Sequence, residues 1–455
     1  MPWKINHFTG QAQLFRNDLE AVFVRRPNRF LIIAKAEGKE TACHCPDPGR
    51  LTELLFPGAR LILEKRCGAE GPADLGRNSS EGRDARGHAC RGAGRPAKTA
   101  YTAAAVSYRG GIVPLFSARV NRAAEKLILE KIIPGLKEIH PEFSLGGSRF
   151  DFLCLDGTGA RHLVEVKACS LVEYGVAMFP DAPSSRALKH LEELAALSGR
   201  GYCCHILFVI THGAPRVFVP NLHTDPEFAA ALYRYGRAAL PGKAAGGVAA
   251  EPGAAARAAG KTAPVLVHAA LIRCGKNGGA RLAEASVSEG AFIPLDLSFG
   301  GLAEKDSGSY LVILEISGTG RMSIEAGSLG NIEIRPGWYV YAGNAMKNLS
   351  RRISRHLRKV RKRKHWHIDY LTPLASNISA LPIRSRRGLE CELAAALEDL
   401  GGKGAPGFGC SDCRGAGGRR CASHLFYFGK NPMENKSFVD MLMRFRHAES
   451  LGLYR

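Results

Sequence analysis

A predicted β-hairpin over residues 149–169 constrains the fold of this chain most strongly. The flanking segments alternate in polarity, and Asp156-Gly157-Thr158-Gly159 between them is a strong turn sequence. With a loop over 157–159, Asp151 lies directly opposite Glu165, where paired residues have Cβ atoms about 5 Å apart. Lys167 lies on the same face as Glu165, because strand side chains alternate with period two. Two carboxylates this close repel unless a cation neutralises them, so the hairpin predicts a site for Mg²⁺ or Mn²⁺.

The same three residues form a pattern with a known chemical use. An Asp followed by Glu-x-Lys across a hairpin resembles the core of the PD-(D/E)xK nucleases. The resemblance implies that Asp151 and Glu165 bind the metal ion and that Lys167 orients the attacking water or stabilises charge, so all three are candidate catalytic residues. The pattern is short, and a surface hairpin with a cross-strand salt bridge also matches it.

Longer motifs around the hairpin narrow the interpretation. In chain order they are Arg25-Arg26-Pro27-Asn28-Arg29-Phe30, His44-Cys45-Pro46-Asp47-Pro48-Gly49-Arg50-Leu51, Phe179-Pro180-Asp181-Ala182-Pro183 and Lys189-His190-Leu191-Glu192-Glu193-Leu194. This series resembles the sugar fermentation stimulation protein A family over about residues 13–298. The resemblance implies an N-terminal OB-like β-barrel, a restriction-endonuclease-like α/β domain of the PD-(D/E)xK type, and DNA binding. Residues 66–97 look inserted relative to the family pattern.

Basic residues near these motifs predict a nucleic-acid surface. Four arginines would give an OB-like barrel a groove of the kind that follows a nucleic-acid backbone: Arg25, Arg26, Arg29 and Arg50. In the simpler alternative, Pro-Asp-Pro-Gly around Asp47 only forms a turn. Arg149 in the hairpin and Lys189 on the helix predicted to follow it are further candidate phosphate contacts, although Lys189 could equally serve only to solvate that helix.

Length and charge define the class of protein. A chain of 455 residues exceeds what one hydrophobic core supports, so two or three domains are expected. A net charge of +21 favours DNA as the partner, with RNA left open because backbone contacts carry little information about the sugar. The start of the sequence lacks the apolar core of a secretory signal and no run of eighteen apolar residues exists, so we expect no membrane contact and a cytoplasmic protein. Thirteen cysteines, an odd count, then indicate reduced thiols.

Two segments read as linkers. Residues 66–97 mix Gly, Arg, Ala, Glu and Ser without a hydrophobic period, and 20 of the 28 residues in 236–263 are Ala, Gly or Pro. Neither can bury enough apolar surface to offset the entropy of ordering, so both are predicted to be disordered. After the second linker, residues 265–272 are predicted to form a strand that returns to the first domain's sheet.

A second unit is predicted from residue 308 onward. Segments 308–313 and 338–345 read as apolar strands, and a helix is predicted from 348. Residues at helical spacing form its predicted buried stripe: Leu349, Ile353, Leu357 and Val360. Residues 347–364 contain ten Lys or Arg and no acid, which favours phosphate binding over a merely solvated face.

These elements resemble the GIY-YIG nuclease superfamily, in particular a GIY-YIG-like domain of unknown function, over about residues 300–430. The matching motifs are Gly308-Ser309-Tyr310, Tyr341-Ala342-Gly343, Arg352, His365-Trp366-His367-Ile368-Asp369-Tyr370-Leu371 and Glu390-Cys391-Glu392-Leu393. The resemblance implies a second catalytic site of metal-dependent hydrolysis. A catalytically inactive DNA-binding module is the alternative.

The resemblance assigns roles to single residues of this second unit. Tyr341 would help to deprotonate the attacking water, supported by Tyr310. Arg352 would stabilise phosphate charge, and Glu390 would hold a divalent metal ion such as Mg²⁺. Glu392 is a rival for that last role, since one residue's shift in helix phase would exchange the two.

Further residues of the second unit carry lesser predictions. Arg351 and Arg355, on the helix of Arg352, are predicted to contact phosphate. Ser309 stands where the superfamily motif has Ile, a harmless change if its side chain faces solvent.

A group of cysteines near the C-terminus has metal-ligand spacing. Four candidate zinc ligands occur in the order Cys410, Cys413, Cys421 and His424. A buried thiol cluster that closes the domain is the alternative, and Cys410 is the least certain member because the family pattern does not need it.

The predicted fold class is therefore α/β (α+β), in three domains. The boundaries are an OB-like barrel at 1–65 and 98–115, a disordered insertion at 66–97, the PD-(D/E)xK-like domain at 116–235 and 264–298, a linker at 236–263, the GIY-YIG-like domain at 300–430 and a C-terminal extension at 431–455. The predicted function is a metal-dependent DNA nuclease. The alternative is a non-catalytic DNA-binding regulator linked to sugar (maltose) metabolism. The sequence does not determine the oligomeric state, and a homodimer remains open.

Overall fold

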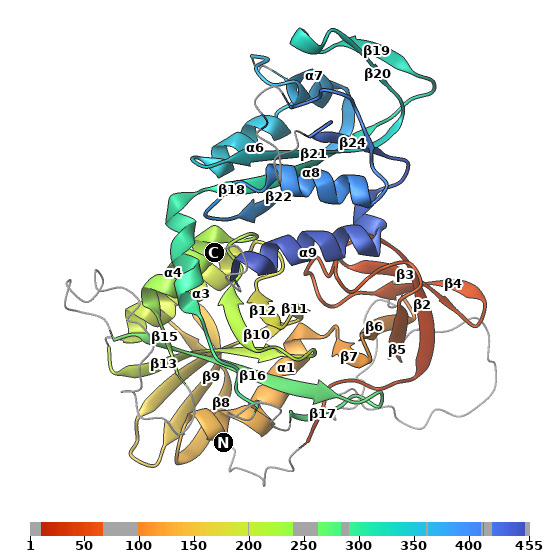
Figure 1. Cartoon of the computed structure of the whole chain (residues 1–455). Coiled ribbons are helices and arrows are strands. Elements are labelled where there is room, and N and C mark those ends of the chain that lie inside the picture. Colours follow the sequence, from red (N-terminus) through yellow and green to blue (C-terminus); the bar gives the residue numbers. More distant parts are fainter. Residues whose placement is uncertain are drawn as a thin grey trace. The chain divides into compact units, whose positions relative to one another are not determined.

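The computed structural model describes residues 11–66, 99–198, 200–239, 263–283, 291–360, 363–410, 413 and 421–450. It divides into two compact units, residues 1–221 with 227–300 and residues 222–226 with 301–455 (Figure 1). Nearly all of the predicted insertion 66–97 and the linker segment 240–262 lie outside the described residues. Within the described residues no helix is long and apolar enough to cross a membrane.

The first unit begins with a closed five-stranded barrel. Its strands are β2 (Leu19–Asn28), β3 (Leu31–Ala36), β4 (Lys39–His44), β5 (Arg60–Lys65) and β6 (Tyr101–Tyr108). Sheet neighbours β4-β3-β2-β5-β6 are antiparallel, and β4 then pairs with β6 in parallel, which closes the barrel. Ile32, Leu63 and Ala103 fill the interior and are fully buried. The predicted N-terminal barrel is confirmed.

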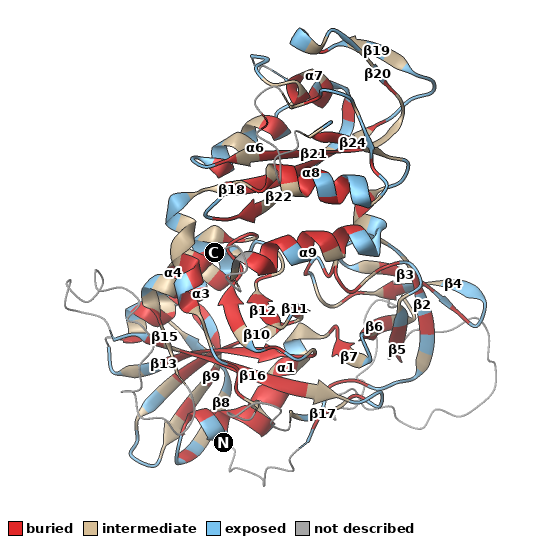
Figure 2. Cartoon of the chain, viewed as in Figure 1, coloured by how far each residue is buried: buried red, intermediate tan, exposed pale blue. Residues whose placement is uncertain are grey.

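A sheet with helices on both faces forms the rest of this unit. Its main strands are β8 (Leu136–Leu145), β9 (Ser148–Asp156), β10 (Arg161–Cys169), β13 (Tyr202–Ile210) and β16 (Val265–Cys274). The order is β16-β13-β10-β9-β8, with β10, β13 and β16 parallel. Figure 2 shows that these three strands are buried over most of their length, as expected of a parallel sheet covered on both faces. The predicted return of residues 265–272 to the sheet is confirmed.

Helices cover the two faces of this sheet. Helix α3 (Ser185–Ser198) packs Leu191 and Leu194 on one face. Leu127 and Ile128 pack on the other, from the run of short helices η1 (Ser117–Arg119), α1 (Val120–Ala123), η2 (Ala124–Ile128) and α2 (Leu129–Ile132). The remaining elements of the unit are β1 (Ala12–Gln13), β7 (Gly111–Pro114), β11 (Leu171–Glu173), β12 (Val176–Phe179), β14 (Val217–Pro220), α4 (Pro226–Tyr235), β15 (Gly236–Ala238), β17 (Gly279–Leu282) and η3 (Leu297–Lys305).

Strand β15 corrects part of the linker prediction. Gly236–Ala238 were assigned to a disordered segment, but they pair in parallel with β16. The strand is held by backbone hydrogen bonds, so it forms although its residues have few apolar side chains to bury. A Cβ at Gly236 would lie 2.5 Å from the Leu232 carbonyl oxygen, so the position requires a residue without a side chain.

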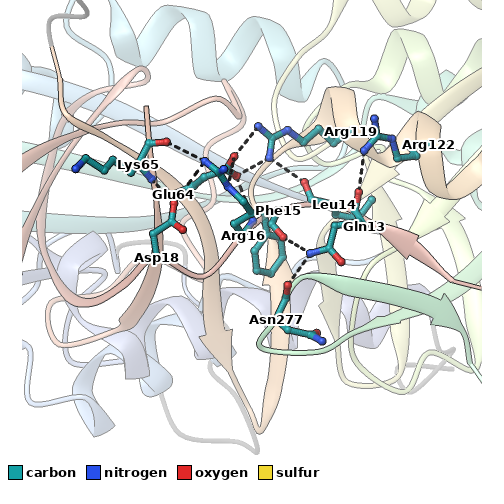
Figure 3. A network of polar contacts seen from close by, with 10 residues as sticks. All are labelled: Gln13, Leu14, Phe15, Arg16, Asp18, Glu64, Lys65, Arg119, Arg122 and Asn277. Carbon is teal, nitrogen blue, oxygen red and sulfur yellow. Dashed lines mark hydrogen bonds and ion pairs between the residues drawn. The ribbon is translucent and has the colours of Figure 1, made fainter. Parts of the chain in front are cut away.

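A polar network ties the barrel to the helical side of the sheet (Figure 3). The Arg119 guanidinium donates to Glu64 Oε2 on β5 at 2.6 Å and to the Leu14 carbonyl at 2.9 Å. Gln13 Nε2 donates to the Asn277 carbonyl at 2.6 Å, which anchors the N-terminal segment to the turn before β17. Only 7% of the Glu64 side chain is exposed, so Arg119 neutralises a carboxylate that water reaches poorly.

The second unit is built on a sheet in the order β22-β18-β21-β24-β23. Its strands are β18 (Gly308–Ile316), β21 (Gly337–Ala345), β22 (Ala375–Arg384), β23 (Lys403–Gly404) and β24 (Leu425–Phe428), with a separate hairpin of β19 (Met322–Glu325) and β20 (Asn331–Ile334). The helices are η4 (Gly327–Leu329), α6 (Leu349–Leu357), α7 (Ile368–Leu371), η5 (Thr372–Leu374), α8 (Glu390–Asp399), η6 (Pro432–Glu434) and α9 (Lys436–Ser450). Helix α9 lies in the segment that was predicted from the sequence to be a C-terminal extension. It is anchored by the buried side chains of Phe438, Val439 and Leu442.

None of the described cysteines lies in a disulfide. Cys67 and Cys90 lie outside the described residues.

The network of Figure 3 yields a stability prediction. Arg119→Ala should lower the free energy of unfolding by roughly 1–3 kcal/mol, because it leaves the poorly exposed Glu64 with only longer contacts to Arg16, 3.4 Å from the backbone N–H and 3.8 Å from the guanidinium. Arg25→Ala is the matched control: its pair with Glu40 is more than half exposed on both sides, so its loss should cost about 0–1 kcal/mol. Urea unfolding of both variants measures the difference, and equal losses would contradict the proposed role of Arg119.

Candidate functional site

The predicted hairpin exists, and its strands separate at the predicted site. β9 and β10 pair antiparallel from Arg161↔Leu155 to Val164↔Phe152, so the predicted register is confirmed. The next pair would be Asp151 with Glu165, but ladder pairing stops before it. Instead the Val166 N–H donates to Asp151 Oδ2 at 2.7 Å. Asp151 and Glu165 are therefore not paired in the ladder as expected. The register is as predicted, but the ladder ends one pair earlier, and a hydrogen bond to the Asp151 side chain replaces the next backbone bond.

Asp151 lies in a poorly solvated position between two elements. Besides Val166, it is contacted by Asn121 of α1, whose Nδ2 donates to Oδ1 at 2.6 Å. Burial and the nearby Glu165 charge raise the pKa of Asp151, against the lowering effect of these hydrogen bonds. Its ionised form is thus disfavoured unless positive charge arrives. Asn121 was not anticipated, since nothing in the sequence links this helix to the hairpin.

Glu165 is the most buried acid of the site. Only 3% of its surface is exposed, and its Oε1 accepts from Lys167 Nζ at 2.5 Å and from His190 Nδ1 of α3. Burial alone would raise the pKa of Glu165, but the hydrogen bonds from His190 and Lys167 outweigh it and lower the pKa. The shared face predicted for Lys167 and Glu165 is confirmed. The structure also places His190 against this carboxylate, a contact that the sequence did not predict.

One oxygen of this site stands out. Glu165 Oε2 is buried and has no hydrogen-bond partner among the described residues. A buried carboxylate oxygen without a partner is costly, and a cation or a water that the site would hold removes that cost. Glu165 lies close enough to Asp151 for its charge to raise the pKa of the Asp151 carboxyl. The two acids together offer hard oxygen ligands of the kind that Mg²⁺ and Mn²⁺ prefer.

In the second unit, each of the two tyrosine motifs contains a glycine at a position where the structure leaves no space for a side chain. Tyr310 and Gly343 are register partners in β18 and β21, and a Cβ at Gly343 would lie 2.6 Å from the Tyr310 hydroxyl. The Tyr310 ring thus occupies the space that a side chain at 343 would need. Gly308 has φ +145°, and a Cβ there would lie 2.3 Å from the Ile383 carbonyl oxygen.

The Tyr310 phenol belongs to a buried network. His356 Nε2 is 2.9 Å from the Tyr310 oxygen, and His356 Nδ1 is 3.8 Å from Asp369 Oδ1. Burial raises the pKa of Tyr310, while Arg352 acts in the opposite direction through its charge and a hydrogen bond. Tyr341 is buried with its ring against His356. The predicted residues Tyr310, Tyr341 and Arg352 are therefore brought together, and His356, four residues after Arg352, is a member that the sequence reasoning missed.

The two rival glutamates of α8 are separated by the structure. The negative charge of Glu390 contributes to the raised pKa of Tyr310, after the larger effect of burial, so Glu390 lies toward the tyrosine network. Glu392 accepts from Arg387 at 2.7 Å in an exposed pair. Glu390 is therefore the better candidate of the two.

Near this network, four potential metal ligands converge. They are Cys391, Cys413, Cys421 and His424, whose ligand atoms all lie within 4.8 Å of one another. Cys410 is not a member, because its Sγ lies against the Phe408 carbonyl at 3.5 Å. The predicted set was thus wrong in one ligand: Cys391, distant in sequence, takes the place of Cys410.

Comparison with known proteins identifies the first unit. Residues 24–72 match the model of the SfsA N-terminal OB domain, and residues 118–241 match that of the sugar fermentation stimulation protein RE domain. A sugar fermentation stimulation protein homolog of Pyrobaculum arsenaticum is 36% identical over 47% of this chain and 80% of its own length. The chain belongs to the sugar fermentation stimulation protein family. A homolog of Moorella thermoacetica is 37% identical, over 49% of this chain and 86% of its own length.

The second unit is matched separately. Residues 309–447 match the model of a domain of unknown function, DUF123. A solved structure, the Pyrococcus furiosus SfsA in complex with Ca²⁺, aligns over 63% of this chain and 99% of its own, with 23% identity and a TM-score of 0.44.

Two family motifs meet in the barrel loop and correct the predicted groove. The Leu51 N–H donates to Asp181 Oδ2 at 3.3 Å, and a Cβ at Gly49 would lie 2.3 Å from the same oxygen. Arg26 holds this loop by donating to four backbone carbonyls, those of Arg29, Asp47, Gly49 and Arg50. Its predicted role in a nucleic-acid groove is replaced by a structural one, in agreement with the turn alternative.

The other predicted phosphate contacts of the first unit lie on the surface. Arg149 pairs with Glu142 at 2.8 Å, with both side chains 61% exposed. Lys189 lies 3.7 Å from Glu193 on α3. Arg50 is exposed, and Arg29 lies over the Phe30 ring at 4.8 Å. Among the described residues, none of these basic side chains contacts Asp151, whereas Asn121 does.

Helix α6 departs from its prediction in two ways. Arg355 was assigned to phosphate, but its guanidinium donates to both oxygens of buried Asp369 at 3.2 and 2.9 Å. Arg351 remains exposed. The predicted apolar stripe fails at its C-terminal end, where Leu357 is 37% exposed and Val360 is 70% exposed. The helix ends at Leu357, and buried His356 replaces them on the inner face.

Ser309 also contradicts its prediction. It is fully buried, and its Oγ accepts from the Leu389 N–H at 2.7 Å. The hydroxyl therefore holds the start of α8, the helix of Glu390.

The hairpin site yields a paired prediction for this family member. Without metal and at neutral pH, Asp151→Asn should stabilise the fold, because it removes an ionised group whose pKa is raised by folding. The gain should vanish as the pH falls below the ordinary pKa of Asp, where the carboxyl is protonated in both states. Glu165→Gln should instead cost roughly 1–3 kcal/mol, because its lowered pKa reports stabilising bonds from Lys167 and His190.

Thermal unfolding in chelator and calorimetric titration with Mn²⁺ test this pair. Both variants should bind Mn²⁺ more weakly than the wild type. Shifts of the same sign in stability, or unchanged Mn²⁺ affinity in both, would contradict this account of the site.

Proposed function

We propose that this chain hydrolyses phosphodiester bonds of DNA at the site of Asp151, Glu165 and Lys167, with Mg²⁺ or Mn²⁺ as cofactor. The observation that carries the proposal is the buried Glu165 Oε2, which lacks a partner among the described residues and lies beside a second carboxylate of raised pKa. Asp151 and Glu165 would hold the ion, which when bound supplies charge neutralisation and a more acidic water.

The other residues of the site have distinct tasks. Lys167, 14% exposed, is the cation through which an incoming phosphate or water could be held beside the carboxylates. His190 donates to Glu165 from α3 and keeps the carboxylate oriented, so it is a positioning residue. Asn121 does the same for Asp151. The hydrogen-bond partners thus fix both acids before substrate arrives, as catalysis by positioning requires.

DNA is the proposed substrate because of charge and of the barrel. The net charge of +21 favours a polyanion, and Arg50 and Arg29 remain exposed on the OB barrel. Contacts to the DNA backbone depend little on base sequence. Because such contacts to phosphates release counterions, the affinity for DNA should fall steeply with salt concentration.

A second hydrolytic site is proposed in residues 301–455. The supporting observation is that Tyr310, Tyr341 and Arg352 converge around His356, with Glu390 toward the same network. In this proposal Tyr341 assists deprotonation of water and Arg352 offers charge to phosphate. Tyr310, whose pKa is raised by burial, stays protonated at neutral pH. Its phenol is therefore a hydrogen-bond donor or acceptor and not a base.

The first site is tested by cleavage of supercoiled plasmid by the full chain. With Mn²⁺ the wild type should nick the plasmid, and Lys167→Met should slow cleavage by about 10²–10³-fold. Glu333→Gln is the control, an exposed acid whose ion pair within the described part of the chain is with Arg321. The cleavage must be scored in the Tyr341→Phe background, so that the second site does not contribute. Cleavage by Lys167→Met at the wild-type rate would exclude the hairpin site.

The second site is tested in the Asp151→Asn background. Tyr341→Phe should abolish the remaining cleavage while DNA affinity stays within about twofold, because only the phenolic oxygen is lost. Tyr339→Phe is the matched control, since the Tyr339 hydroxyl bonds to the Arg335 backbone. Loss of cleavage in both tyrosine variants would indicate a general packing effect and overturn the role of Tyr341. DNA binding without cleavage in any variant or ion would favour the non-catalytic regulator.

A further inference from the structure

We propose that Cys391, Cys413, Cys421 and His424 bind a zinc ion, which clamps the start of α8 to the start of β24. The proposal concerns a structural site and stands whether or not either hydrolytic site is active. It differs from the set expected from sequence spacing in its first ligand, which comes from a helix.

The distances suit zinc and not a disulfide. Cys391 Sγ and Cys413 Sγ are 3.4 Å apart, and all four ligand atoms lie within 4.8 Å of one another. Tetrahedral zinc with Zn–S near 2.3 Å and Zn–N near 2.0 Å separates its sulfur and nitrogen ligands by roughly 3.5–3.8 Å. A disulfide needs about 2.05 Å between the sulfurs. The four atoms are therefore close enough to bind one ion, provided that the longest separations, of up to 4.8 Å, shorten when it binds.

The donor set selects the kind of metal. Three thiols and an imidazole are soft or intermediate ligands, which favour zinc over the hard ions Mg²⁺ and Mn²⁺. Four protein ligands leave no open position for a substrate or a catalytic water, so the site is of the structural type. Cys391, Cys413 and His424 are buried, as a closed site requires.

A buried apolar thiol cluster does not explain this arrangement as well. Such a cluster needs apolar contact but no meeting of four ligand atoms. Cys410, on the same segment as Cys413, has its Sγ against a backbone carbonyl outside the group. An imidazole would also be an unusual member of an apolar cluster, because its polar nitrogens require partners.

The positions of the ligands define what the ion would hold. Cys391 is the second residue of α8, directly after Glu390, and His424 directly precedes β24. The His424 carbonyl accepts from the Ala342 N–H at 2.9 Å, beside Tyr341 on β21. Cys413 and Cys421 bring in the connecting segment, whose described residues form no helix or strand between Gly409 and Ser423. The ion would thus tie the helix of Glu390 to the strand next to Tyr341.

Zinc content of the purified full chain is the direct test. The wild type should contain one zinc per chain, released by a mercurial that reacts with thiols. Cys391→Ser should lose that zinc, whereas the matched variant Cys410→Ser should keep it. A wild type that takes up no zinc on titration, or retention in Cys391→Ser with loss in Cys410→Ser, would overturn the proposal.

Two further measurements cover the case in which Cys391→Ser does not fold. Cys391→His keeps a ligand at this position, and its zinc content should approach that of the wild type. Hydrogen exchange on the wild type should show that chelation lowers the protection of α8 and β24 and leaves β9 and β10 unchanged. A Cys391–Cys413 disulfide in the protein as isolated, or unchanged protection of α8 after zinc removal, would contradict the clamp.

Discussion

The hydrogen bond from the Val166 amide to Asp151 is the contact on which the candidate active site of the first unit depends. It ends the β9–β10 ladder after Val164↔Phe152, while β10 continues in parallel with β13. The carboxylate therefore turns toward β10, where Glu165 and Lys167 follow on one face. The local loss of a ladder bond is thus compensated by a bond that fixes the Asp151 carboxylate against β10.

Electrostatics in this site are unbalanced in an informative way. Glu165 has two cationic or donating neighbours, Lys167 and His190, and its pKa is lowered despite burial. Asp151 has only neutral donors, and burial with the Glu165 charge raises its pKa. Removing charge from water is expensive unless partners compensate. A bound cation would complete the compensation for Asp151 and satisfy the remaining Glu165 oxygen.

The sequence was informative where local patterns decide the structure. The hairpin turn with its register and the strands of Tyr310 and Tyr341 follow from alternation, apolar runs and glycines, whereas the barrel was implied only by the resemblance to a family. Residues brought in by tertiary packing could not be read in this way. His190 reaches Glu165 from α3, and Cys391 reaches Cys413 from α8.

Charge runs misled for a related reason. The sequence shows that Arg26 and Arg355 are basic. It does not show that Arg26 donates to backbone carbonyls or that Arg355 pairs with the buried Asp369. Both arginines were predicted to face nucleic acid, and both hold the fold instead. Ser309 shows the converse, since its side chain was expected to be harmless in solvent but is buried and accepts from the Leu389 N–H just before the helix of Glu390.

A crystal of the full chain soaked in Mn²⁺, with anomalous scattering recorded at the manganese edge, tests the central claim most directly. The account predicts an anomalous peak bound by the Asp151 carboxylate and Glu165 Oε2. A map without a peak at this site, with Lys167 and His190 still on Glu165 as its only partners, would contradict it.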